Sequence, residues 1–332
     1  MGRRTLRGWI LRPLTDIKAI ERRQKSIAVL VDSRSECAEL LDGLAGTRDI
    51  ERALSRLALG TGNPADLGAI RDTLRIIPAI RAIDLNEPVK AIISSFPDLQ
   101  DLSKYLEDAL EDRLPRNFGD GNIVRSGFSE ELAHWRDIRS GGDKWLDDYL
   151  AKEREATATP RLKAGYTNAY GYYLEAGKAG LTIQPDYFRH TQTLVNAKRY
   201  TTPELKKFEA QMNNSEAEIS RIEGELCQKI IENVMSYSSQ LQMTGRLLGI
   251  LDCSASSAGI ARERNYICPV VDDSDVIEIK GGRHPVIEVE LRDAGFVPND
   301  VTLNKDGRII ILTGPNMAGK STWLRMTALI AI

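Results

Sequence analysis

Apolar side chains recur every three or four positions through most of residues 16–128, which is the spacing of one face of an α-helix. One such run follows Asp16, and a second lies between Asp49 and Leu59. Residues 60–64 (Gly-Thr-Gly-Asn-Pro) predict a loop, and Pro64 can occupy the first turn of the next helix, which continues through Ile77. The pattern predicts an all-helical region, punctuated later by prolines.

Two long helices and a different kind of segment follow. Residues 129–157 predict one highly charged helix with Ser129 as its N-cap. Residues 161–200 contain six tyrosines and four glycines, which favour short strands and tight turns. Thr202 and Pro203 then predict the start of a second helix, with proline at its first position.

The second helix is predicted to be the longest element of the chain. Its apolar or small residues recur with an average spacing of about 3.5, the period of a coiled coil. They stand at positions 205, 208, 212, 215, 219, 222, 226, 230, 234, 237, 241, 244, 248 and 251. A helix of about 50 residues would span roughly 75 Å. It therefore needs a long partner, and residues 129–157 are the expected one, so that the two helices form an arm with a β-rich tip.

After residues 254–257 the pattern changes to short apolar runs at 276–279, 301–303 and 309–312, which predict strands of an α/β domain. The last run is continuously apolar, as in a buried parallel strand. It leads into Gly314-Pro315-Asn316-Met317-Ala318-Gly319-Lys320-Ser321, which matches GxxxxGK[ST], and then into an apolar helix. This strand–loop–helix context predicts a phosphate-binding P-loop.

The chemistry of a P-loop assigns a role to each of its residues. Glycines let backbone N–H groups converge on phosphate oxygens, Lys320 would reach the β- and γ-phosphates, and the Ser321 hydroxyl would bind Mg²⁺. The alternative is a tight strand-to-helix turn with an incidental lysine. Hydrolysis also needs an acidic residue after a further strand, and no strand follows Ile332, so this chain by itself is expected to be catalytically inactive.

Charge is distributed unevenly along the chain. The whole sequence carries a formal net charge of −2, whereas residues 161–200 hold six Lys or Arg against two acids, a local charge of +4. A positive, tyrosine-rich tip is suited to a nucleic-acid backbone, with little reading of the bases. The alternative is an ordinary solvated charged surface.

Other features narrow the class of protein. The four cysteines have no CxxC or metal-ligand spacing, which is typical of a reducing compartment, and each is expected to pack in the interior. No apolar run is long enough to cross a membrane, and the basic start is no signal peptide. A cytoplasmic, nucleoid-associated protein is expected. Because both ends fall inside apolar stretches, we expect an internal piece of a longer chain.

Four stretches identify a family that the chain resembles. They are Gly171–Glu175 (GYYLE); Gln192–Tyr200 (QTLVNAKRY) with Thr202–Leu205 (TPEL); Gly282–Val286 (GRHPV); and Thr313–Thr322 (TGPNMAGKST). They resemble the MutS family of DNA mismatch-repair ATPases over nearly the whole length. The resemblance implies a mostly helical α + α/β chain. Its parts would be a helical core (1–128), a clamp (129–217), a lever helix returning to the core (218–263), and the start of an ABC-type P-loop ATPase domain (264–332).

The resemblance also implies binding residues, cofactors and partners. ATP with Mg²⁺ would be bound by Gly314, Pro315, Asn316, Met317, Ala318, Gly319, Lys320, Ser321 and Thr322, with Ser321 holding the metal. Phe296 would pack on the adenine, and a core aromatic is the alternative role for it. DNA would be contacted by Asn196, which falls at a backbone-contacting position of the family, with Arg189 and His190 nearby. The positive charge of the tip adds Lys178, Lys198 and Arg199 to the expected DNA contacts. The chain departs from the family at His190-Thr191, where a basic pair is usual, which leaves Arg189 as the nearby substitute. His284 is interpreted as a structural turn residue.

The implied partners are mismatched double-stranded DNA, a second MutS-type subunit and a MutL-type protein. A relative that acts on recombination junctions, or a purely DNA-binding module without enzymatic activity, remains an alternative. A coiled-coil chromosome-organising ATPase is disfavoured, because in such chains the P-loop precedes the coiled coil.

Overall fold

The structure is a computed structural model that describes residues 1–167, 170–291, 295–315 and 318–332. It divides into two compact units. The first unit comprises Met1–Gly46, Pro78–Phe96 and Met243–Ile332, and the second comprises Thr47–Ile77 and Pro97–Gln242. The described residues are mostly helical, with small antiparallel sheets, as the sequence predicts.

The first unit begins with helices. They are α1 (Gly2–Leu11), α2 (Ile17–Asp32), α3 (Arg34–Ala45), α6 (Val89–Ser94) and most of α10 (Ser238–Arg264). The predicted start of α2 is confirmed, since the Asp16 carboxylate accepts a hydrogen bond from the Lys18 N–H at 3.0 Å. Gly2 packs so closely on α10 that its N–H donates to Asp252 at 2.8 Å.

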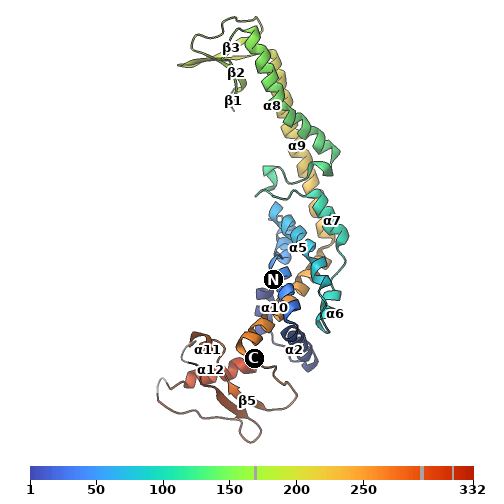
Figure 1. Cartoon of the computed structure of the whole chain (residues 1–332), viewed down its shortest axis with the longest axis vertical. Coiled ribbons are helices and arrows are strands. Elements are labelled where there is room, and N and C mark those ends of the chain that lie inside the picture. Colours follow the sequence, from blue (N-terminus) through green and yellow to red (C-terminus); the bar gives the residue numbers. More distant parts are fainter. Residues whose placement is uncertain (168–169, 292–294, 316–317) are drawn as a thin grey trace. The chain divides into compact units, whose positions relative to one another are not determined.

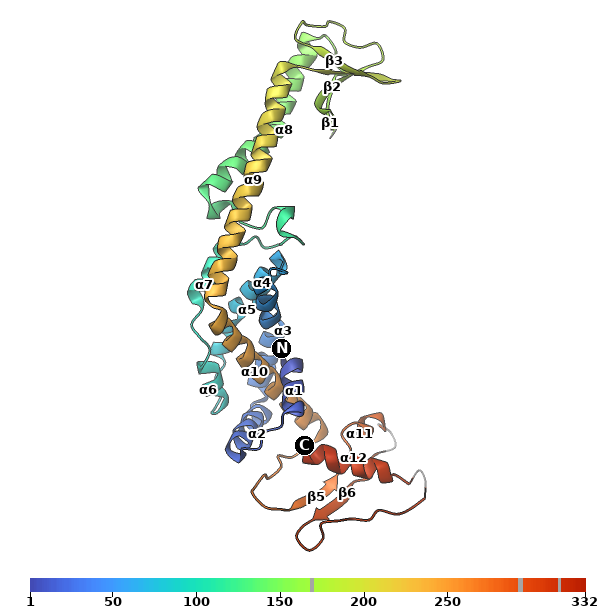
Figure 2. The same cartoon turned by 180° about the vertical axis from the view of Figure 1, so that it is seen from behind.

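The rest of the first unit is a small α/β assembly, seen around β5 and α12 in Figure 2. Its elements are β5 (Ile277–Gly282), α11 (Ile287–Glu290), β6 (Asn299–Leu303) and α12 (Lys320–Ala331). The two strands are antiparallel, with Ile279 opposite Val301. Both side chains and Met326 of α12 are buried together. Two of the three predicted strands are therefore confirmed.

The third predicted strand is wrong. Residues 309–312 have no regular secondary structure, and Ile309 and Ile311 are 84% and 85% exposed. A buried parallel strand depends on neighbours that accept its hydrogen bonds and cover both faces. Among the described residues, β5 and β6 pair only with each other. The apolar composition of residues 309–312 favours burial, but the described residues provide no neighbouring strand to bury them.

The second unit contains the remaining helices. They are α4 (Ile50–Ala58), most of α5 (Pro64–Ala82), α7 (Gln100–Ala109), the 3₁₀ turns η1 (Phe118–Asp120) and η2 (Ser126–Phe128), α8 (Glu130–Ala156) and α9 (Pro203–Ser236). The Asp49 carboxylate accepts from the Arg52 N–H at 3.1 Å at the start of α4. Pro64 is the first residue of α5, as expected. The predicted helical region is thus confirmed.

Helices α8 and α9 lie side by side and form the expected arm (Figure 1). Ser129 and Thr202 cap them, each accepting from the N–H three residues on. Ion pairs between the helices show that they are antiparallel, because rising numbers on α8 match falling numbers on α9. These pairs are Glu131–Arg221, Arg139–Glu216 and Lys152–Glu204.

The prediction of one helix over 202–251 is wrong in one respect. Helix α9 ends at Ser236 and α10 begins at Ser238, with Tyr237 between them. The Tyr237 N–H bonds the Val234 carbonyl three residues back, and the Ser236 hydroxyl bonds the Asn233 carbonyl. Serine hydroxyls compete with the backbone ladder in this way. The apolar spacing continues across the break, which is why the pattern did not reveal it.

The tip between α8 and α9 is a four-stranded antiparallel sheet in the order β1-β2-β4-β3. Its strands are β1 (Lys163–Thr167), β2 (Gly171–Gly177), β3 (Arg189–Thr193) and β4 (Ala197–Thr201). One face packs on the arm, where Leu174, Tyr200 and Phe208 share a buried cluster with side chains of α8. The predicted short strands are confirmed.

Candidate functional site

The glycine-rich loop after residue 313 leads into α12, which begins at Lys320. Gly319 precedes the helix with φ +84°, and Gly314 has φ +150°. Both angles are rare for residues with a side chain, although a Cβ would meet nothing within 4 Å at either position. The conformation of the loop, and not the space around it, therefore requires glycine. Asn316 and Met317 lie outside the described residues.

Lys320 is the charged side chain of this loop, and it folds back over the loop backbone. The Lys320 ammonium donates to the carbonyl oxygens of Gly314 and Pro315, so it lies over the loop itself. No side chain caps α12 in the described part of the loop, which leaves first-turn N–H groups for another acceptor. Ser321 is exposed and Thr322 is half-buried. This cation and these N–H groups could hold an anionic phosphate chain.

Beside the loop lies a pocket of about 500 Å³. Lys320, Thr322, Thr313 and Asn299 supply polar side chains to its wall, and Phe296 lies in the wall as well. The other lining residues are apolar or small: Ile287, Leu291, Gly295, Val297, Leu312, Ala318, Gly319 and Trp323. Phe296 also packs against the buried cluster around Met326, so it is partly a core residue. A flat apolar ring with a phosphate tail fits this combination of walls.

His284 is confirmed as a structural turn residue. It is 4% exposed, and its Nδ1 accepts from the N–H groups of Val286 and Ile287 at 3.3 and 3.2 Å, at the start of α11. Nδ1 is therefore unprotonated and the ring proton is on Nε2. Nε2 is buried without a hydrogen-bond partner among the described residues.

At the tip, three of the predicted DNA-contacting residues gather at one end of the sheet. Gly177, the last residue of β2, pairs with Ala197, the first residue of β4. Lys178 and Asn196 directly follow and precede these residues, and both are exposed. The Lys198 ammonium also lies at this end, because a Cβ placed on Gly180 would be 3.4 Å from its Nζ. We call Lys178, Asn196 and Lys198 the sheet-end group.

Arg199 has a different environment from its neighbour Lys198. On the opposite face of the sheet it pairs with Glu175 at 3.1 Å, donates to Gln192 Oε1 at 3.1 Å, and lies 4.1 Å from the centroid of the Tyr173 ring. Only 17% of its side chain is exposed. Its charge is therefore matched within the sheet. Strand register places Glu175 opposite Arg199, a pairing that sequence reasoning missed and that alternation along the two strands could have suggested.

The other two predicted contacts lie apart from the sheet-end group. Arg189 is the first residue of β3 and pairs with Thr201, at the opposite end of the hairpin from Asn196. His190 packs edge-on against Tyr200, and its Nε2 is 3.0 Å from the Thr193 hydroxyl. Arg189 is exposed, but the structure does not bring it beside Asn196.

Two phenols, the buried Tyr149 and the exposed Tyr187, form hydrogen bonds where the arm meets the tip. Tyr149 of α8 and Thr202 share a hydrogen bond of 2.5 Å, and the Tyr187 hydroxyl donates to the buried Glu153 at 2.9 Å. Burial raises the pKa of Tyr149. Burial, and then the hydrogen bond to Glu153, raises the pKa of Tyr187. Both hydroxyls therefore stay protonated to a higher pH than an ordinary tyrosine, and their hydrogen bonds link α8 to Thr202 and to the tip.

Among the cysteines, Cys37, Cys227 and Cys253 are buried as expected, but the prediction for Cys268 is wrong because it is exposed. It follows α10 in a segment without regular structure, where it has no buried face to join. In the described ranges, no three His, Cys, Asp or Glu side chains gather to hold a metal ion. None of the helices described there is both long enough and apolar enough to span a bilayer.

Comparison with known proteins identifies similar chains. Residues 1–258 match the family model described as MutS domain III. All of this chain aligns with proteins named DNA mismatch repair protein MutS. The one from Methanosarcina mazei is 37% identical, with 38% of its length covered. Those from Halalkalibacterium halodurans and Thermotoga sp. (strain RQ2) are each 39% identical, with 39% and 41% covered. The chain thus spans about two fifths of the length of these relatives.

Proposed function

This chain belongs to the MutS family, and from that premise we propose that it is the DNA-gripping and nucleotide-binding part of a DNA mismatch repair protein. Its tip would hold the backbone of double-stranded DNA, and its glycine-rich loop would bind ATP with Mg²⁺. The observation that carries the proposal is the sheet-end group, which places two cations and an amide at one end of the sheet, with Lys178 and Asn196 exposed and Lys198 half-buried.

The sheet-end group has the chemistry of phosphate contact. Lysine ammonium groups neutralise phosphates as point charges, and the amide of Asn196 can donate to a phosphate oxygen without reading a base. The acid nearest in register, Glu175, is already matched by Arg199. The positive charge of Lys178 and Lys198 is therefore left for a polyanion.

The loop has the chemistry of nucleotide binding. Lys320 would exchange the carbonyls of Gly314 and Pro315 for phosphate oxygens, and Ser321 would turn its hydroxyl to Mg²⁺. Phe296 would face the adenine from the wall of the pocket. The described residues that line the pocket include no carboxylate to hold the metal or orient water. For this chain alone we propose binding without hydrolysis.

The salt dependence of DNA binding tests the tip. The logarithm of the binding constant should fall linearly with the logarithm of salt concentration, with a slope of about −0.9 for each phosphate neutralised. Lys178→Gln and Lys198→Gln should each make the slope shallower by about 0.9. Arg199→Gln, the matched control on the adjacent position, should leave the slope unchanged. Binding that ignores salt, or an equal loss of slope in all three variants, would exclude this site.

Nucleotide titration tests the loop. Lys320→Ala should abolish binding of ATP with Mg²⁺, whereas Lys305→Ala, which changes an exposed lysine outside the pocket, should leave it unchanged. An unaltered ATP dissociation constant in Lys320→Ala would refute the assignment. ATP turnover above background by this chain would refute the proposal that it does not hydrolyse ATP.

We further propose that the full-length protein acts as a dimer with a second MutS-type subunit and with a MutL-type partner. The premise is family membership. Cross-linking of the full-length protein, with and without DNA, is the direct test.

A further inference from the structure

A small crosspiece lies at the base of the arm, where the chain passes from α7 to α8. It consists of residues 109–112 and 122–125, which run antiparallel through an isolated bridge between Leu110 and Val124. The Glu111 N–H donates to the Ile123 carbonyl at 2.9 Å, and the Arg125 N–H donates to the Ala109 carbonyl at 2.8 Å. Such a short ladder is too small to be stable by itself, so its position depends on what holds its edges.

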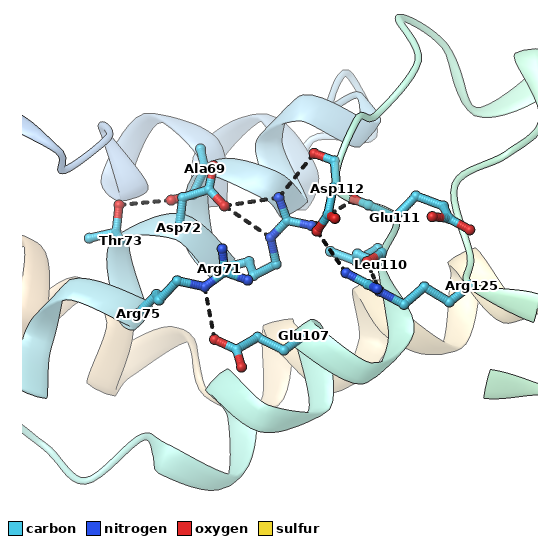
Figure 3. A network of polar contacts seen from close by, with 10 residues as sticks. All are labelled: Ala69, Arg71, Asp72, Thr73, Arg75, Glu107, Leu110, Glu111, Asp112 and Arg125. Atoms are coloured by element: carbon cyan, nitrogen blue, oxygen red, sulfur yellow. Dashed lines mark hydrogen bonds and ion pairs between the residues drawn. The ribbon is translucent and has the colours of Figure 1, made fainter. Parts of the chain in front are cut away.

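Guanidinium groups hold the edge formed by residues 110–112 (Figure 3). Arg71 of α5 is 4% exposed and donates to the Glu111 carbonyl at 2.7 Å, while its Nε bonds Asp72 at 2.9 Å. Arg125 donates to the Leu110 carbonyl and to the Asp112 carboxylate, both at 2.7 Å. This edge is thereby fixed to α5.

One carboxylate holds the other edge. Glu223 of α9 is 3% exposed and accepts from three consecutive backbone N–H groups, those of Asn122, Ile123 and Val124, at 3.1, 2.6 and 3.0 Å. Arg136 of α8 adds a fourth donor at 3.0 Å. The hydrogen bonds that this buried carboxylate accepts are charge-assisted and depend strongly on geometry. Loss of the carboxylate would leave several donors without a hydrogen-bond partner.

Arg136 joins α8 to the same point. Besides Glu223, it donates to the Val124 carbonyl at 2.8 Å and to the Ser126 hydroxyl at 2.9 Å. Glu223 and Arg136 thus tie both helices of the arm and the crosspiece together. The apolar contacts between α8 and α9 are non-directional and would tolerate small rolling movements. The buried polar contacts would not.

We propose that Glu223, with Arg136, is a positioning residue that sets the direction of the arm and thereby places the sheet-end group on DNA. The proposal rests on the DNA contact proposed above. Along α9, the distance from Glu223 to Leu205 beside the tip is about 27 Å at 1.5 Å per residue. A swing of about 10° at the base would therefore move the tip by about 5 Å. Hydrogen bonds to phosphate do not survive such a displacement.

Glu223→Gln is the direct perturbation. The amide keeps one acceptor oxygen but turns an NH₂ group toward a backbone N–H and removes the charge that faces Arg136. Arg136→Gln is the second variant, since it frees α8 while leaving the three backbone donors on Glu223. Glu225→Gln is the matched control, two residues away on the same helix, where the carboxylate is exposed and pairs only with Arg221 among the described residues.

Two measurements on the full chain test the proposal. Spin labels at Val195→Cys on the tip and Asp101→Cys on α7, in a Cys268→Ser background, report the distribution of distances between tip and base. Glu223→Gln and Arg136→Gln should broaden this distribution by about 5 Å. DNA affinity should fall about threefold or more, because the competent orientation is less populated. The salt slope should not change, because the phosphate contacts themselves are intact.

The outcomes distinguish failure of the positioning role from failure of the proposed DNA contact. Unchanged distributions in both variants, or equal broadening in Glu225→Gln, would overturn the positioning role. If Glu223→Gln does not fold, the distance distribution of Arg136→Gln decides between the two outcomes. If the unmodified chain shows no salt-dependent DNA binding, the proposed function fails. The width of the distance distribution still tests, in that case, whether Glu223 and Arg136 hold the base of the arm.

Discussion

At Gly171, the addition of a single methyl group should strongly destabilise the tip. It is buried at the start of β2 with φ +72°, in the left-handed region. A Cβ there would lie 1.8 Å from Oε1 of Glu209 and 2.4 Å from its Cδ. Gly171→Ala therefore meets both an unfavourable backbone conformation and a side chain of α9.

The magnitude follows from these two effects. A left-handed residue with a side chain costs about 1–2 kcal/mol. Forcing the Glu209 side chain from its rotamer adds about 0.5–1.5 kcal/mol. The local free energy of opening should therefore fall by about 1.5–3.5 kcal/mol, which is a factor of roughly 10 to 400 in the opening equilibrium.

Hydrogen exchange of a peptide that covers residues 171–177 measures this opening. Gly177→Ala is the matched control, at the exposed end of the same strand, where a Cβ would meet nothing within 4 Å. In Gly171→Ala the β2 amides should exchange much faster than in the control, while peptides from α4 and α5 keep their rates. Equal exchange in the two variants would refute the reasoning that close approach and positive φ make Gly171 obligatory.

Three further predictions concern the arm and the thiols. The pKa of Tyr149 is raised in the folded state. The contribution of Tyr149 to stability is therefore complete below the unfolded-state pKa of about 10 and is lost as the pH rises above that value. The loss is at most about 1.4 kcal/mol per pH unit. Urea unfolding between neutral and alkaline pH should therefore show a shallower loss in Tyr149→Phe, and an identical loss would contradict this. Thr202→Ala should destabilise α9 by about 0.5–2 kcal/mol in the same assay, with Thr202→Ser restoring most of it. Ellman's reagent should modify Cys268 rapidly in the native protein but Cys227 only after unfolding, since burial raises the pKa of Cys227 to about 12. A rapid phase that survives Cys268→Ser would contradict the burial of the other three thiols.

Local chemistry made much of the fold predictable. Ser129, Thr202 and Pro203 act within one turn of the backbone they cap, so their effect does not depend on the rest of the molecule. The antiparallel arm followed from helix length and apolar spacing alone. Short strands could be predicted in the tyrosine- and glycine-rich segment, because the alternation of buried and less buried residues along β2 depends on neighbouring positions in the sequence.

The failures share a different origin. Residues 309–312 have the composition of a buried strand, but composition cannot supply the neighbouring strands that such a segment needs. The break at Tyr237 is invisible to a periodicity that continues on both sides of it. Cys268 was expected inside because cysteine usually is, yet burial is a property of the surroundings.

The candidate sites divide in the same way. The glycines and lysine of the loop could be read directly, because phosphate binding uses consecutive backbone groups. The net charge of the tip could also be counted from the sequence. The count did not show that the charge of Arg199 is matched by an acid while that of Lys198 is not matched among the described residues. Only strand register showed that Arg199 is matched by Glu175 while Lys198 reaches the open end of the sheet.

The sequence by itself determined the helices, their caps, the strand-forming tip and the glycine-rich loop, because each depends on residues within a few positions of one another. The tertiary structure alone decided which charges are free and which are matched. It also revealed Glu223, whose donors stand about 100 residues earlier in the chain. A buried carboxylate is costly without partners, and those partners become neighbours only when the chain has folded.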